Sequence, residues 1–88
     1  MKLQQLRYTL EVYKHNLNVS EAAEALFTSQ PGISKQIRLL EDELGIQIFI
    51  RNGKRVVAVS EPGKQVLQVA ERMLRDAQNI KRIGAEFS

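Results

Sequence analysis

The stretch Ala22–Gly45, which reads AAEALFTSQPGISKQIRLLEDELG, decides the fold of this chain. A short, alanine-rich helical pattern is interrupted by the turn Phe27-Thr28-Ser29, and a longer helical pattern follows it. Ser29 can cap the longer helix, and Pro31 fits in its first turn, where a missing N–H has no helical partner to lose. Gly45 is typical of the left-handed residue that ends a helix. Two helices joined by so short a turn predict a helix-turn-helix.

Apolar residues at helical spacing indicate which faces of the helices are buried. The expected inward residues are Val19, Ala22, Ala23 and Leu26 in the short helix and Ile33, Ile37, Leu40 and Leu44 in the longer one. Upstream, Leu3, Leu6, Leu10, Tyr13 and Leu17 form a third stripe, whose pattern breaks at His15-Asn16. Asn18 is expected to cap the short helix, with Glu21 as its capping-box partner.

Residues 46–59 have the pattern of a β-hairpin. Asn52-Gly53 lies between two runs that are rich in β-branched residues. Asn-Gly is the strongest short-range hairpin signal, because both central positions of a type I′ turn require a positive φ. We therefore expect a two-stranded ribbon with Asn52-Gly53 at its tip, leaning on the helices before it.

A final helix is predicted from Ser60 onward, with Ser60 as its cap and Pro62 in its first turn. Its heptad-like seam consists of Val66, Ala70, Met73, Ala77 and Ile80. About 25 residues at a 1.5 Å rise span roughly 40 Å, which is more than the small body before it can cover. We expect this seam to form a homodimer, although a helix with two apolar flanks can also pack on its own domain.

The longer helix of the pair carries the candidate binding residues. With its apolar stripe inward, Pro31, Ser34, Lys35 and Arg38 share the opposite face, and Gln30 projects at the N-terminus. Helix-turn-helix proteins present this part of the second helix to base edges in the major groove. We therefore predict base readout by Gln30, Pro31, Ser34 and Lys35, and contacts to the DNA backbone by Ser29 and Arg38. The alternative is a polar face that is merely solvated.

The hairpin adds a second signal for nucleic acid, because Arg51, Lys54 and Arg55 surround its tip. A wing of this kind can contact phosphates or place an arginine in the minor groove. A hairpin kept soluble by its charges is the other interpretation of the same residues.

Composition excludes several classes of function. The chain has 88 residues, 43% of them hydrophobic, a net charge of +3 and no cysteine. Neither disulfides nor cysteine–zinc sites are therefore possible. His15 is the only histidine, and no pattern of catalytic or phosphate-binding residues occurs. We expect neither an enzyme nor a cofactor or metal. No apolar run is long enough to cross a bilayer, so a cytoplasmic protein is expected.

Three segments together resemble the LysR-type transcriptional regulators: Ala22–Ile37, Leu40–Gly45 and Ile48–Arg51. The resemblance covers essentially the whole chain. Within the family, residues 15–20, 28–36 and 43–49 most resemble the activators of the cysteine regulon, which control sulfur assimilation. The resemblance implies a mainly α winged helix-turn-helix over residues 1–60 and a linker helix for dimerisation over residues 61–88. It also implies base-reading positions at Gln30, Pro31, Ser34 and Lys35, and a wing arginine at Arg51.

The resemblance further implies a longer parent protein. Family members carry an effector-binding domain, which in the sulfur-related group takes an acetylserine-type inducer, and they can form tetramers at full length. That domain is absent, so we expect the chain to be a truncated fragment. Departures from the family pattern are Lys35 in place of arginine, Gly32 in place of alanine, and Val59–Gly63 after a hairpin that is one residue longer.

The sequence thus predicts a homodimer that binds an inverted-repeat site in duplex DNA and regulates transcription, most specifically of sulfur-assimilation genes. The main alternative is a helical dimerisation module without DNA readout. An enzyme subunit is the second alternative, and no residue supports it.

Overall fold

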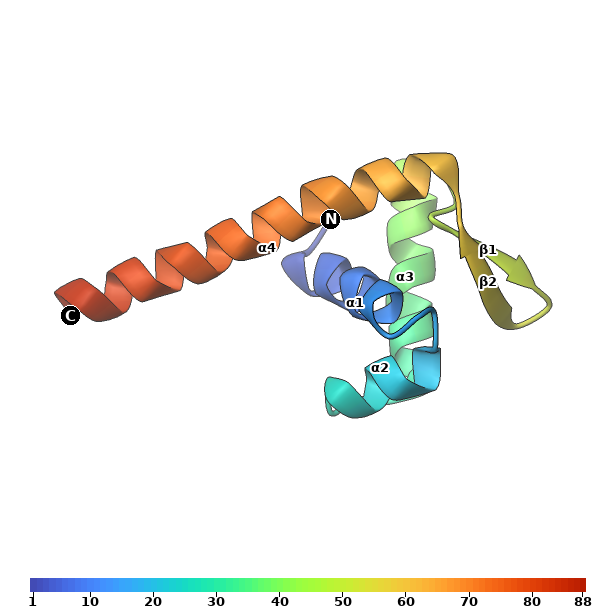
Figure 1. Cartoon of the computed structure of the whole chain (residues 1–88), viewed down its shortest axis with the longest axis horizontal. Helices are drawn as coiled ribbons and strands as arrows, with labels where there is room; N and C mark the ends of the chain where they lie inside the picture. The colour runs from blue at the N-terminus through green and yellow to red at the C-terminus, as the bar shows by residue number, and fades with distance from the viewer.

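Four helices and one antiparallel hairpin make up the computed structural model, which describes residues 1–88 (Figure 1). The elements are α1 (Leu3–Lys14), α2 (Val19–Ala25), α3 (Gln30–Leu44), β1 (Phe49–Asn52), β2 (Arg55–Val59) and α4 (Glu61–Phe87). Helices α1, α2 and α3 pack on one another, and α4 crosses α1 before it extends away from the body. The predicted order of elements is confirmed. No helix combines the length and the apolar character that spanning a membrane requires.

All three predicted N-caps are present. The side-chain oxygens of Asn18, Ser29 and Ser60 accept hydrogen bonds from the backbone N–H three residues later, at 3.0, 3.1 and 2.9 Å. The expected capping box at Asn18 is not formed, because its own N–H donates to the His15 carbonyl oxygen and not to Glu21. Each cap satisfies an N–H that the first turn of a helix leaves unpaired.

Three helices end in the same left-handed way. The φ angle is 56° at Asn16, 54° at Phe27 and 70° at Gly45. At each end, the N–H of the following residue bonds to a carbonyl five residues back, as in Leu17 to Val12 at 2.8 Å. This is the Schellman arrangement. It ends α1 at Lys14, so the expectation that its helical stripe continues to Leu17 is wrong.

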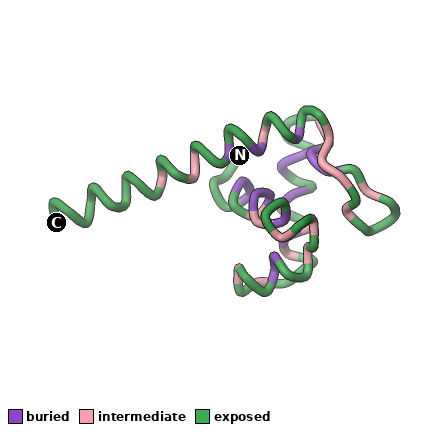
Figure 2. The backbone as a smooth tube through the Cα atoms, viewed as in Figure 1, coloured by how far each residue is buried: buried purple, intermediate pink, exposed green.

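The core lies where α1, α2, α3, the start of the hairpin and the first half of α4 meet (Figure 2). Its buried residues are Leu6, Val12, Ala22, Ala23, Ile33, Ile37, Leu40, Ile48, Phe49 and Ala70. Three residues of the predicted stripes are instead exposed: Leu3, Tyr13 and Leu44. Helix α1 packs against three other helices, so its buried side is centred on Leu6 and takes in Gln5 and Thr9. The Thr9 hydroxyl donates to the Gln5 carbonyl oxygen at 2.7 Å, which makes its burial tolerable.

The hairpin differs from the expected type I′ turn. Asn52 pairs with Arg55, so the two residues at the tip are Gly53 and Lys54. Of these, only Gly53 has a positive φ, at 64°, and Asn52 has an ordinary negative φ. A single positive φ at the first central position is the pattern of a type II′ turn. The register also shifts between Ile50 and Arg51, and the bulge leaves Val57 as the extra residue on β2.

Helix α4 is joined tightly to the body at its start and is free at its end. Ser60 N–H donates to the Ile48 carbonyl oxygen at 2.9 Å, and Gly63 is buried against the same peptide. Of the predicted dimerisation residues, Val66, Ala70 and Met73 pack on the chain's own core. Ala70 is only 1% exposed, so it is not available to a partner. Ala77 is half-buried and Ile80 is exposed. The C-terminal part of α4, orange to red in Figure 1, extends beyond the body.

Candidate nucleic-acid interface

The N-terminal half of α3 presents a polar, accessible face. Gln30, Pro31, Lys35 and Arg38 are exposed, and Ser34 is half-buried. Ile33 and Ile37 on the other side of the helix are buried in the core, which fixes the rotation of α3 about its axis. Ser29 lies at the start of the helix with its hydroxyl occupied as the cap. The predicted base-reading residues therefore lie on the outer side of α3.

A groove runs between this face and the hairpin. Helix α3 contributes Gln30, Pro31, Ser34 and Arg38 to its walls, and the hairpin contributes Arg51, Lys54 and Val56. A neighbouring hollow joins Gln30 to the hairpin residues 54–56 and to the turn and helix start at residues 16–20. The structure thus brings together all the predicted contact residues of α3 and the hairpin except Ser29 and Lys35, which line neither hollow.

Gln30 is oriented by a partner that the sequence did not reveal. The Ser20 hydroxyl, in the first turn of α2, donates to Gln30 Oε1 at 3.0 Å. The side-chain amide of Gln30 is therefore left with both N–H groups free to donate. Ser20 and Gln30 lie on different helices and are brought together by the short turn between α2 and α3. Residue spacing within a single helix therefore could not predict this contact.

The three cations of the hairpin fall into two kinds. Lys54 and Arg55 are exposed at and beside the tip, with no ion-pair partner. Arg51 is different, because its Nη2 lies 2.9 Å from Glu41 Oε1 and its side chain is only 14% exposed. Glu41 itself lies on α3 and is buried, and sequence reasoning missed it. The sequence offered only one signal for it, namely an acidic residue next to the apolar stripe of α3, and this signal did not identify its partners.

Comparison with known proteins gives the family. Residues 3–64 match the model for the bacterial regulatory helix-turn-helix protein, lysR family. This chain belongs to the LysR family. Over all 88 residues it is 53% identical to the HTH-type transcriptional regulator SsuR of Burkholderia cenocepacia and 52% identical to the HTH-type transcriptional regulator CysB of Haemophilus influenzae. It spans 29% and 27% of those two regulators, so the matched part is less than a third of each.

Solved LysR-family structures have the same arrangement of helices and wing. The BenM DBD/catB site 1 DNA complex matches with a TM-score of 0.89 and 31% identity, over 99% of this chain and 96% of that one. The CbnR DBD–DNA complex matches with a TM-score of 0.84 and 30% identity over the whole of both chains. The fold described above is therefore the winged helix-turn-helix of LysR proteins, as the sequence predicted, and the chain's curated relatives are transcriptional regulators and not enzymes.

Proposed function

We propose that this chain binds duplex DNA in order to regulate transcription, as the DNA-reading part of a LysR-family regulator. One observation carries the proposal: the outer face of α3 and the cationic tip of the hairpin line one groove, with Gln30, Ser34 and Arg38 on one wall and Lys54 on the other. A helix flanked by a basic wing suits a duplex, because the helix can enter the major groove while the wing contacts the adjacent backbone.

The residues divide into two roles in this proposal. Base edges are read by Gln30, Pro31, Ser34 and Lys35, whose amide, ring, hydroxyl and ammonium groups match donors, acceptors and the thymine methyl in the major groove. The DNA backbone or minor groove is contacted by Ser29, Arg38, Lys54 and Arg55. Arg51, for which the sequence predicted the same role, is engaged with Glu41.

We assign residues 1–60 to DNA reading and residues 61–88 to dimerisation. The support lies on α4, where the apolar side chains of Val69, Ile80, Ile83 and Phe87 are exposed. Nearer the body, an apolar groove that includes Val69 is lined by Met1, Leu6, Leu44, Gln65, Val66, Val69, Ala70 and Met73. Covering such a surface with α4 of a second copy would join two reading helices about a two-fold axis, which suits an inverted repeat.

The genes that we propose as targets are those of sulfur assimilation. The support is the resemblance of residues 15–20, 28–36 and 43–49 to cysteine-regulon activators, together with the 52% identity to CysB of Haemophilus influenzae. A regulator of this kind acts on the bacterial chromosome, so we place it in the cytoplasm. An acetylserine-type inducer would act through the effector domain of a longer parent protein.

Fluorescence anisotropy with labelled duplexes tests the proposal. The chain should bind a sulfur-gene promoter duplex containing an inverted repeat more tightly than its scrambled version, and both should weaken steeply as salt rises. Gln30→Ala should cost about 1–3 kcal/mol on the inverted repeat and little on the scrambled duplex. Lys54→Ala, the matched control on the wing, should weaken binding to both duplexes alike and reduce the salt slope by about 1 for each bound protomer.

Two other outcomes would change the interpretation. Equal losses from Gln30→Ala on both duplexes would contradict base readout by that residue. No binding to either duplex at low salt would favour a dimerisation module without DNA readout.

A further inference from the structure

A buried carboxylate lies where α3 meets the start of β1, the first strand of the hairpin that forms the wing. Glu41 is 5% exposed and accepts four hydrogen bonds. Its Oε2 accepts from the backbone N–H groups of Ile48 and Phe49 at 2.8 and 3.2 Å. The guanidinium of Arg51 donates to Oε1 through Nη2 at 2.9 Å and to Oε2 through Nη1 at 3.3 Å. One side chain of α3 thus binds both the backbone at the start of β1 and a side chain further along it.

These hydrogen bonds of Glu41 fix the start of the hairpin beside α3. Ile48 and Phe49 are fully buried, and the Ile48 carbonyl oxygen also accepts from Ser60 N–H. The strand is therefore fixed to α3 through Glu41 and to the start of α4 through Ser60. A forked arginine–carboxylate pair adds a fixed orientation to this attachment, because both groups are planar.

We propose that Glu41 and Arg51 are positioning residues that set the angle of the wing beside α3 and so place Lys54 and Arg55 on the DNA backbone. This inference rests on the proposed function. It assigns Arg51 to the protein's interior contacts and not to the duplex. Moving Arg51 onto a phosphate would leave the buried carboxylate of Glu41 without its counter-charge, which is strongly unfavourable.

The two roles of Arg51 predict opposite effects for Glu41→Gln. This substitution removes the negative charge that lies against Arg51, and if Arg51 contacts DNA it also releases the arginine. A direct contact therefore predicts tighter binding. The positioning role predicts weaker binding, because the glutamine no longer holds the guanidinium and the wing loses its fixed angle.

The experiment is a double-mutant cycle measured with a labelled duplex of scrambled sequence over a range of salt. The tip variant Lys54→Ala/Arg55→Ala should lower the salt slope by about 2 for each bound protomer, one for each phosphate that its wing no longer neutralises. Glu41→Gln and Arg51→Met should each lower the slope nearly as far. Combining either of them with the tip variant should weaken binding little further, since both changes act through the same two phosphates.

Three results would overturn the positioning role: tighter binding by Glu41→Gln, an Arg51→Met effect that adds fully to that of the tip variant, or an unchanged slope in Glu41→Gln. If the unaltered chain bound no duplex at all, the proposed function itself would fail. The two failures are therefore distinguishable.

A second measurement uses the unaltered chain and does not depend on any variant's folding. The guanidinium NMR signals of Arg51 and the amide signals of Ile48 and Phe49 report directly on the Glu41 contacts. They should stay in place and stay protected from exchange when the scrambled duplex is added, while signals of Lys54 and Arg55 shift. Movement of the Arg51 signals together with the tip signals would contradict the proposal.

Discussion

Single residues carry two different kinds of information in this chain. Ser29, Pro31 and Gly45 could be assigned from sequence because a cap, a first-turn proline and a helix-ending glycine act on their immediate neighbours. Glu41 could not, because its partners Ile48, Phe49 and Arg51 lie beyond the end of its own helix. The same holds for the contact of Ser20 with Gln30. Local rules predict local partners, and the wing's attachment is not local.

Gly63 occupies a position where packing leaves no room for a larger side chain. A Cβ at this position would meet the carbonyl group of Ile48 far inside van der Waals distance, and that neighbour is backbone, so it cannot turn away. Gly63→Ala should therefore lower the free energy of unfolding by about 1–3 kcal/mol, as measured by urea denaturation.

Gly84→Ala is the matched control for that substitution. It lies in the same helix, and nothing stands within 4 Å of its Cβ position. The better helix propensity of alanine should leave stability equal or slightly raised. Similar losses in both variants would mean that the glycine's effect is on α4 itself and not on its contact with Ile48.

At the scale of the elements, the starts of helices were easier to predict than their ends. Asn18, Ser29 and Ser60 each cap a helix through a side chain that has a strong preference for that position. The ends of α1 and α2 use left-handed Asn16 and Phe27, and phenylalanine carries almost no signal for that conformation. The hairpin tip moved by one residue for a related reason. Asn-Gly permits more than one turn, and the pairing of β1 with β2 selects between them.

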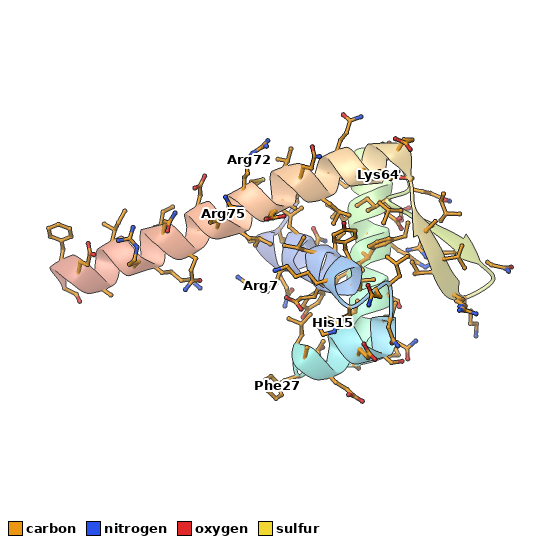
Figure 3. All side chains as sticks on the ribbon, in the orientation of Figure 1. Arg7, His15, Phe27, Lys64, Arg72 and Arg75 are labelled. Carbon is orange, nitrogen blue, oxygen red and sulfur yellow. The ribbon has the colours of Figure 1, made fainter.

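The left-handed Phe27 leads to a prediction about the end of α2. Its side chain is 97% exposed and points away from the body (Figure 3), so replacing it removes no packing. Glycine adopts this backbone conformation without strain, and Phe27→Gly should therefore raise the free energy of unfolding by about 1 kcal/mol in a denaturant titration.

Phe27→Ala separates backbone strain from removal of the ring. Alanine retains a Cβ and hence the strain, so its stability should stay within about 0.5 kcal/mol of the unaltered chain. Equal gains in the two variants would show that removing the exposed ring, and not relieving the backbone, stabilises the protein.

At the scale of the whole molecule, the length of α4 could be predicted from the sequence. Which of its apolar residues pack on the chain's own domain, and which stay exposed, could not. A heptad-like seam does not reveal which of its positions the chain's own domain will cover. The structure covers Ala70 and partly covers Val66 and Met73, and it leaves Ile80, Ile83 and Phe87 exposed. The surface left for a partner is therefore displaced toward the C-terminal half of the seam.

Ile80 tests this displaced surface. Ile80→Glu should shift the chain from dimer to monomer in sedimentation velocity, because a charge replaces a 69% exposed apolar side chain at the centre of the proposed contact. Gln78→Glu is the control, since it adds the same charge at an exposed position on the opposite side of α4. Dissociation by both variants would indicate general charge repulsion and not a specific seam.

Helix α4 is fixed to the body at Ser60 and Gly63 and extends away from it, so it acts as a lever arm. Its 27 residues extend about 40 Å at 1.5 Å per residue, so a tilt of roughly 10° at this attachment displaces the far end by about 7 Å. That displacement equals about two base-pair steps of B-DNA at 3.4 Å each. The peptide group between Ile48 and Phe49 accepts a hydrogen bond from Ser60 N–H and donates one to Glu41. The start of α4 and the start of the wing are therefore attached to the same peptide group. In the proposed dimer, a small rotation at this one peptide group would therefore change both the distance between the two reading helices and the position of each wing beside its helix.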